Sequence, residues 1–136
     1  MDASDNLTLE TTMIFVGDCA GKGRGIFAQR KICEGEKIEE APVVVLPASE
    51  IEFLDKTVLQ DYYFVWGEDE EQAAIMLGLC SLCNHSYSPN AIFNLLPERS
   101  AIEFIALRDI ERGEEITINY NGDPENQKSI WFDTQD

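Results

Sequence analysis

Two short stretches carry side chains that can do chemistry, and packing alone explains neither of them. Residues 84–90 place the only histidine of the chain, His85, among asparagines, serines and a proline directly behind an apolar run. Polar groups and a rigid turn therefore come where a core element ends. Residues 116–122 end an alternating strand pattern on Tyr120 and then turn at Asn-Gly, which leaves the Tyr120 hydroxyl at a strand terminus.

A pair of cysteines offers a second chemistry. Cys80 and Cys83 form a Cys-x-x-Cys pair followed by His85, as in a fragment of a zinc site. A structural zinc site needs four ligands, and Cys19 and Cys33 stand alone in the sequence. We therefore expect reduced thiols and no metal. A small zinc or redox protein built on this pair stays open, and finding no metal and freely titratable thiols would exclude it.

Size and charge limit the partners of these side chains. A chain of 136 residues with 44% hydrophobic content forms one globular domain. The net charge of −16 repels nucleic acids and anionic membranes and attracts basic proteins, although an acid excess can also serve solubility alone. Residues 1–12 lack the basic and apolar regions of a secretory signal, and no apolar run is long enough to span a membrane. We expect a cytoplasmic protein.

Mainly β elements must position the candidate residues. Residues 1–12 are predicted to be a flexible lead-in. A helix or helical turn is predicted over residues 49–60, because Ser49 and Glu52 have the spacing of a capping box. Prolines flank residues 43–46, and they confine this strand to an edge or to an end of pairing. The other predicted strands and hairpins are residues 13–16 and 25–28 around a glycine-rich turn, 62–66, 91–96 with 101–107, and 115–120.

Two further patterns accompany these elements. Residues 30–38 and 108–116 are an internal echo, and each predicts a strand, a charged turn with glycine, and a second strand. In the aromatic run, alternation sends Tyr62, Phe64 and Trp66 to one face. These three side chains are either core or the wall of a channel, where cation–π contacts would hold a positively charged group.

Three motifs in this order resemble the SET domain, a family of S-adenosylmethionine-dependent protein-lysine methyltransferases. They are Asn-His-Ser at residues 84–86 with Pro-Asn at 89–90, Gly-Glu-Glu-Ile-Thr at 113–117 running to Tyr120, and a glycine-rich turn at 21–25. The resemblance implies several small sheets in a β-clip-like fold with short helices, and a C-terminal pseudoknot that brings His85 and Tyr120 together. It places a SET domain at residues 13–122 and a tail at 123–136.

The resemblance also implies roles for individual residues. Tyr120 is the expected catalytic tyrosine, whose hydroxyl would orient the lysine amine and the transferring methyl group. No metal is expected. The residues expected to bind S-adenosylmethionine are Gly21, Lys22, Gly23, Arg24, Asn84, His85 and Trp131. The residues expected to line the lysine channel are Tyr62, Phe64, Trp66 and Ile118. The implied partner is a basic, lysine-containing protein.

The chain departs from larger members of the family in ways that affect its substrate. Tyr87 stands where a cysteine commonly follows Asn-His-Ser, and no cysteine triplet follows Tyr120. The zinc-bound segments of many chromatin-modifying members are therefore not expected, which argues against a histone substrate. The compact form is similar to stand-alone bacterial and viral SET proteins, some of which are dimers, so a homodimer is expected as one possibility. The tail would pack on the active site or on a partner. The alternative function is a SET-like module that binds a basic protein without catalysis.

Overall fold

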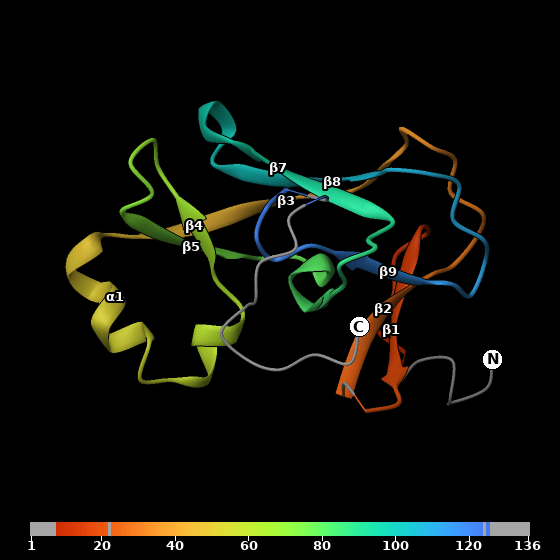
Figure 1. Ribbon diagram of the computed structural model, residues 1–136, viewed down its shortest axis with the longest axis horizontal. Coiled ribbons are helices and arrows are strands. Elements are labelled where there is room, and N and C mark those ends of the chain that lie inside the picture. The colour runs from red at the N-terminus through yellow and green to blue at the C-terminus, as the bar shows by residue number, and fades with distance from the viewer. Residues whose placement is uncertain (1–7, 22, 124, 126–136) are drawn as a thin grey trace.

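The structure is a computed structural model that describes residues 8–21, 23–123 and 125. Lys22 and Trp131 lie outside the described residues. The described chain is mainly β, with short helices between strands (Figure 1). The strands are β1 (Ile14–Cys19), β2 (Gly23–Ala28), β3 (Lys37–Leu46), β4 (Phe64–Trp66), β5 (Gln72–Met76), β6 (Asn84–His85), β7 (Ala91–Leu96), β8 (Ala101–Ala106) and β9 (Glu115–Ile118). The helices are α1 (Ala48–Leu54) and the 3-10 helices η2 (Val58–Asp61), η3 (Leu79–Leu82) and η4 (Pro97–Arg99).

The strands form two sheets, as the family resemblance implied. One sheet has the order β1-β2-β9-β6 and the other the order β4-β5-β3-β8-β7. Neighbouring strands are antiparallel except β6 and β9, which run parallel. In Figure 1 the second sheet extends from β4 and β5 toward β9, and the β1–β2 hairpin lies at the other end of the molecule. Both predicted hairpins are confirmed.

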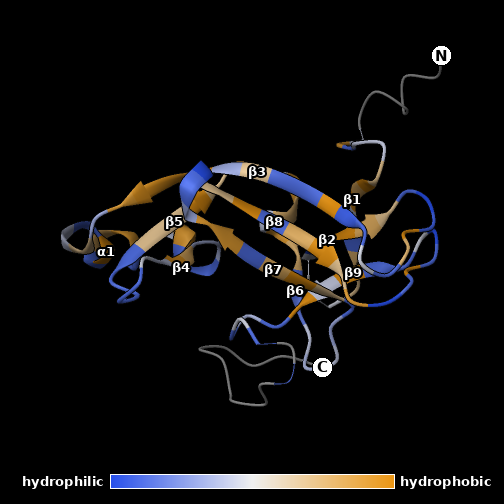
Figure 2. Cartoon of the chain, turned by 90° about the horizontal axis from the view of Figure 1, so that it is seen from above, coloured by the Kyte–Doolittle hydropathy of each residue, from blue (hydrophilic) through white to orange (hydrophobic). Residues whose placement is uncertain are grey.

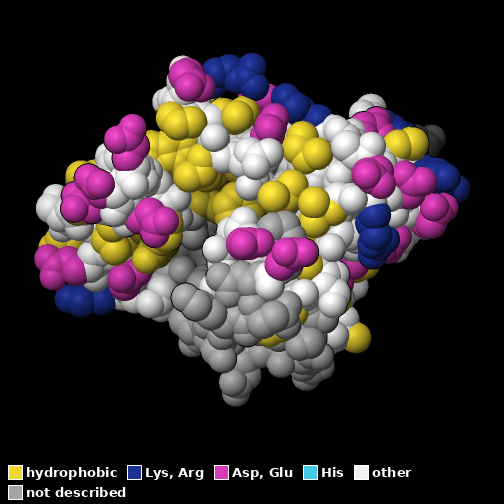
Figure 3. All heavy atoms as spheres, turned by 45° about the horizontal axis from the view of Figure 1, so that its top comes forward, with side chains coloured by type: hydrophobic (Ala, Val, Ile, Leu, Met, Phe, Trp, Pro, Cys, Tyr) yellow, Lys and Arg dark blue, Asp and Glu magenta, His cyan; other side chains and the backbone are white. Residues whose placement is uncertain are grey.

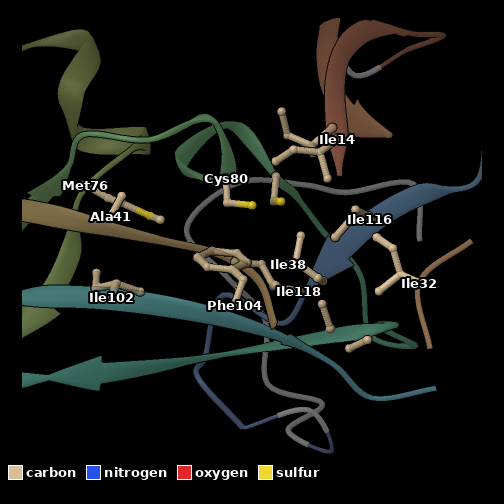
Figure 4. Packing of buried hydrophobic residues seen from close by; sticks show 14 of the residues in the cluster. Ile14, Ile32, Ile38, Ala41, Met76, Cys80, Ile102, Phe104, Ile116 and Ile118 are labelled. Atoms are coloured by element: carbon tan, nitrogen blue, oxygen red, sulfur yellow. The ribbon is translucent and has the colours of Figure 1, made fainter. Parts of the chain in front are cut away.

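The core lies where the two sheets and η3 meet (Figure 4). Phe104 of β8 and Ile116 of β9 are fully buried, and Cys80 of η3 is 1% exposed. Figure 2 shows hydrophobic and hydrophilic segments along the same strands, as on β3 and β8. This mixture follows from alternation, because successive side chains of a strand point to opposite faces. No described helix is long and apolar enough to cross a membrane.

The proline-flanked strand is central, so the expectation of an edge strand is wrong. β3 lies between β5 and β8 in the five-stranded sheet. The alternative, an end of pairing, is correct: the pairing of β3 with β8 ends at Pro42 and the pairing with β5 begins at Val43. A proline has no N–H to donate, so it is tolerated where one ladder replaces another.

Two local predictions also need correction. The predicted helix over residues 49–60 is two pieces, α1 and η2, and α1 begins after Pro47 without a side-chain cap. The capping box at Ser49 therefore does not form, because the helix already includes Ala48 and Ser49. The aromatic strand starts at Phe64 rather than at Tyr62, which belongs to the turn that ends η2.

The internal echo is two copies of one turn. In the first copy, the Glu36 carboxylate accepts from Arg30 at 2.7 Å and from the Cys33 backbone N–H at 3.0 Å. Gly35 has a φ of 84°, and so does Gly113 in the second copy. A left-handed backbone of this kind favours glycine, because a Cβ would crowd the following carbonyl.

The second copy repeats these hydrogen bonds. The Glu114 carboxylate accepts from Arg108 at 2.8 Å and from the Glu111 N–H at 3.0 Å. The copies are joined by reciprocal backbone hydrogen bonds between Ile32 and Ile110, of 2.8 and 2.7 Å. The predicted pair of similar units is confirmed, and the pairing holds the start of β9 in place.

Candidate active site

The parallel pairing of β6 with β9 brings the two chemical stretches together. Asn84 pairs with Thr117 and His85 with Ile118. Just beyond β9, the Tyr120 backbone N–H donates to Nδ1 of His85 at 2.9 Å. The rings of His85 and Tyr120 are 5.2 Å apart between centroids. His85 is 3% exposed, so the imidazole fixes the position of Tyr120 from inside the core.

The Tyr120 hydroxyl is held at a defined point. It donates to the backbone carbonyl of Cys83 at 2.7 Å. Burial raises the pKa of Tyr120 well above its ordinary value, and the nearby Cys83 thiol, Tyr62 and acidic groups add to this. The side chain is therefore a neutral phenol at physiological pH, because the charged form is poorly solvated there. A neutral phenol can accept a hydrogen bond while its own proton is engaged.

Tyr120 lies in the wall of a cavity of about 680 Å³. Ile118 and Cys83 also line it. Phe64 and Phe93 meet edge to face there with centroids 5.0 Å apart. Figure 3 shows hydrophobic side chains, in yellow, gathered across the middle of this face of the molecule. The lining includes the aromatic residues Tyr62, Tyr63, Phe64, Phe93 and Tyr120.

Carboxylates stand around the same cavity. Asp61, Glu68 and Glu70 line it, and all three are exposed. Glu68 and Glu70 come from the loop between β4 and β5, in which Glu70 has a φ of 57°. Aromatic walls with carboxylates near the opening suit a long apolar side chain that ends in a positive charge, because the walls pack the stem and the acids attract the charge.

A second cluster joins the glycine-rich hairpin to β6 and β9. The Asn84 side-chain nitrogen donates to the Arg24 carbonyl at 3.1 Å and to the Glu115 carboxylate at 2.7 Å. The Cys19 thiol donates to the other Glu115 oxygen at 3.3 Å. Gly25 is buried beside this pair. Arg24 and Asn84, which the sequence assigns to cofactor binding, are therefore in contact.

The turn between β1 and β2 leaves room for a ligand to approach its backbone closely. Gly21 and Gly23 have φ values of 80° and 76°, and a Cβ at Gly23 would meet nothing within 4 Å. There is thus open space beside Gly23, and the backbone of this turn carries N–H and C=O groups near the Asn84 carboxamide. Such a donor and acceptor set matches the amino acid part of S-adenosylmethionine, which carries both a carboxylate and an ammonium.

Asn90 fixes the strand that leads to the site. It is 2% exposed, its side-chain oxygen accepts from the Thr117 N–H at 2.9 Å, and its side-chain nitrogen donates to the Glu115 carbonyl at 2.7 Å. These two hydrogen bonds hold β9 at the turn after Pro89. No local sequence pattern indicated that β9 is the partner of Asn90.

The structure places one predicted channel residue elsewhere. Trp66 is 8% exposed and packs in the core, and it does not line the cavity. Phe64 stands where cavity and core meet, because its ring contacts both Phe93 and Phe104. The Trp66 side chain is part of the core, although its neighbours Val65 and Gly67 line the cavity. Sequence reasoning missed Phe93 and Glu115, and the Gly-Glu-Glu motif was the one local signal that could have drawn attention to Glu115.

The cysteine pair is buried beside the cavity. Cys80 and Cys83 are 1% and 2% exposed, and burial raises the pKa of the Cys80 thiol. Cys80 is therefore a neutral thiol, which is a poor metal ligand. Among the described residues, no group of three histidine, cysteine or acidic side chains is arranged to hold a metal ion.

Comparisons with known proteins agree with this geometry. The family model for the SET domain matches residues 23–121. The chain is 35% identical over 121 residues to a histone-lysine N-methyltransferase of Schizosaccharomyces pombe, specific for H3 lysine 37, and the match covers 88% of this chain and 77% of that protein. It is also 35% identical over 112 residues to the H3 lysine-36 specific enzyme of Saccharomyces cerevisiae. That match covers 75% of this chain but only 15% of the yeast protein.

Solved structures share the fold. A crystal structure of a Plasmodium falciparum protein has a TM-score of 0.64 and 28% identity, and the match covers 82% of this chain and 95% of that one. ctPRC2 bound to S-adenosylmethionine has a TM-score of 0.67 and 24% identity, with 79% of this chain and 15% of that chain covered. The second likeness concerns the fold alone.

Proposed function

Since the chain belongs to the SET domain family, we propose that it transfers a methyl group from S-adenosylmethionine to the side-chain amine of a lysine in a protein. The observation that carries the proposal is the Tyr120 hydroxyl, held at 2.7 Å from the Cys83 carbonyl in an aromatic-lined cavity. A lysine side chain entering this cavity would place its amine beside these two oxygen atoms.

The acceptor amine must be neutral before it can attack a methyl group. Free lysine titrates near pH 10.4, so its neutral form costs roughly 4 to 5 kcal/mol at pH 7. The apolar walls formed by Phe64, Phe93 and Ile118 lower the lysine pKa by desolvation. Tyr120 and the Cys83 carbonyl then orient the amine, so the protein contributes alignment rather than a nucleophile.

The proposed cofactor residues are those around the hairpin tip. S-adenosylmethionine supplies an electrophilic methyl group on a sulfonium when it is bound. Gly21, Gly23 and Arg24 offer backbone groups, and Asn84 offers its carboxamide. The His85 imidazole holds Tyr120 in place. The His85 backbone would bind the cofactor beside Asn84. Lys22 and Trp131 remain predictions, because they lie outside the described residues.

We propose a histone-type substrate. The lack of a cysteine triplet in residues 121–136 argued against histones, but the relatives reported above are named histone-lysine methyltransferases. The net charge of −16 and the carboxylates at the cavity also suit a basic protein. Cytoplasmic location and a homodimer stay predictions.

Labelled S-adenosylmethionine tests the proposal with histone H3 and other lysine-rich proteins as acceptors. The Tyr120→Phe variant is expected to lower kcat about 100-fold, which is about 2.7 kcal/mol in the barrier. Tyr87→Phe is the matched control, because it also removes a hydroxyl from a ring that packs on His85, and it is expected to keep most of the activity. Cofactor binding without any labelled product would favour the alternative, a binding module without catalysis.

A second experiment tests the basic substrate. Glu68→Gln and Glu70→Gln are expected to raise KM for a lysine-rich peptide about two- to fivefold each and to leave kcat unchanged, because they weaken attraction at the opening. Glu50→Gln in the first turn of α1 removes the same charge away from the cavity. An equal effect of all three variants would show that net charge, not position, attracts the substrate.

A further inference from the structure

We propose that Glu115 is a positioning residue for the cofactor. It fixes the Asn84 carboxamide so that Asn84 Oδ1 accepts a hydrogen bond from the cofactor's ammonium group. The inference rests on the proposed function and deepens it, because it adds Glu115 as the residue that orients a cofactor-binding side chain. Three observations carry it: the partners of the Asn84 amide, the fixation of the Glu115 carboxylate, and the space left by Gly25.

The partners of Asn84 decide which way its amide points. Asn84 Nδ2 donates to the Glu115 carboxylate at 2.7 Å and to the Arg24 carbonyl at 3.1 Å. Both partners can only accept, because neither an ionised carboxylate nor a carbonyl has a proton to give. A flipped amide would place Oδ1 against two oxygen atoms. Both N–H bonds are thus used, and the orientation of the amide is fixed without the cofactor.

The fixed amide leaves its oxygen for a ligand. Among the described residues, the hydrogen bonds of the Asn84 side chain are those of Nδ2 alone. Oδ1 is an acceptor, so it selects a donor group and rejects the cofactor's carboxylate. The donor groups of S-adenosylmethionine are its ammonium, the adenine amine and the two ribose hydroxyls, and only the ammonium is charged. The negative charge of Glu115 behind the amide favours the cation.

The Glu115 carboxylate is itself held at both oxygens. Oε2 accepts from Asn84, and Oε1 accepts from the Cys19 thiol at the end of β1. A carboxylate held on two sides loses little further freedom when the ligand binds, so the geometry is set in advance. The hydrogen bond from Cys19 therefore gives the β1–β2 hairpin a direct contact with the residue that orients Asn84.

Gly25 makes room for this arrangement. A Cβ added at Gly25 would lie 2.7 Å from Glu115 Oε2 and 2.9 Å from Asn84 Nδ2. Both distances are too short for a real contact, so an alanine would push the carboxylate and the amide apart. The backbone of Gly25 is not in the left-handed region, and alanine is thus tolerated by the chain itself. Gly25→Ala therefore disturbs the pair while both of its side chains remain present.

The test compares two ligands by calorimetry on the full chain. S-adenosylhomocysteine carries the amino acid part, whereas 5′-methylthioadenosine keeps the adenosine and the sulfur but lacks it. Glu115→Gln is expected to weaken S-adenosylhomocysteine binding about tenfold, the loss of one charge-assisted interaction, and methylthioadenosine binding less than about twofold. Gly25→Ala is expected to give the same split.

The control is the neighbouring carboxylate. Glu114 accepts from Arg108 and Asn90 rather than from Asn84, so Glu114→Gln removes the same charge and is expected to leave both affinities within about twofold. Thermal unfolding of each variant verifies that it is folded. If Glu115→Gln does not fold, Gly25→Ala alone decides.

The outcomes are distinct. Equal weakening of the binding of both ligands would mean that Glu115 supports the hairpin in general. Unchanged affinities would mean that Glu115 does not act on the cofactor. Either result overturns the inference and leaves the proposed function intact. If the wild-type protein binds neither ligand, the cofactor assignment fails and the inference fails with it.

Discussion

Replacing Asn90 by alanine tests whether β9 is held by this one side chain. Asn90 is 2% exposed, and its carboxamide bonds the Thr117 N–H at 2.9 Å and the Glu115 carbonyl at 2.7 Å. Alanine would leave both backbone groups without these partners in a partly buried place. A polar group left unsatisfied in this way costs about 1 to 3 kcal/mol. We therefore expect Asn90→Ala to lower the free energy of unfolding by about 3 kcal/mol.

Such a loss is large for a small domain, whose total stability is about 5 to 15 kcal/mol. It corresponds to a fall of about 10 °C in Tm for a chain of this size. Urea unfolding followed by tryptophan fluorescence measures it, since Trp66 is buried in the core. Asn94→Ala is the matched control: Asn94 is exposed and makes one side-chain hydrogen bond, to Glu103 at 3.1 Å.

The control is expected to change the stability by less than about 0.5 kcal/mol. The reasoning is refuted if Asn90→Ala and Asn94→Ala destabilise the protein equally. Because β9 leads to Tyr120, methyl transfer by folded Asn90→Ala protein should also be impaired.

The remaining predictions concern the paired turns and the buried tyrosine. Gly35 and Gly113 share a φ of 84° and have nothing within 4 Å of an added Cβ, so Gly35→Ala and Gly113→Ala should each cost about 1 to 2 kcal/mol of backbone strain. Clearly unequal costs in urea unfolding would contradict the equivalence of the two turns. Burial raises the pKa of Tyr120, so the folded protein binds the phenol proton more tightly than the unfolded chain does. The contribution of this protonated hydroxyl to the free energy of unfolding is therefore complete below about pH 10, and it is lost as the pH rises further. As the pH rises above about 10, wild-type protein should lose more stability than Tyr120→Phe, and equal losses would argue against a buried phenol.

Local pattern was sufficient for the two hairpins and for the echo. The β7–β8 hairpin and the two charged turns follow from alternation, glycine placement and charge, which act over a few residues. Pattern was insufficient where a residue's role depends on how its strand packs against the rest of the protein. Phe64 and Trp66 share a face by alternation, yet only Phe64 reaches the cavity.

The site itself depends on contacts far apart in the chain. β6 has two residues, and its parallel partner β9 begins 30 residues later, so no local signal predicts their pairing. The family resemblance supplied the meeting of His85 and Tyr120, which the structure contains. It did not supply Glu115 as the partner of Asn84, because that contact depends on the register between β9 and the hairpin.

Tyr120 is attached twice to one short segment, through its N–H to His85 and through its hydroxyl to the Cys83 carbonyl. Strands β1 to β8 all precede Tyr120 in the sequence. A chain emerging from the ribosome can therefore form the β1–β2 hairpin and most of the five-stranded sheet before Tyr120 is available. Tyr120 comes late in the chain, and β6, the short strand whose His85 holds it, is completed only when β9 pairs with it. Chains that end before Tyr120 would be inactive because they lack this residue. Methyl transfer would begin only when β9 and Tyr120 have docked against β6.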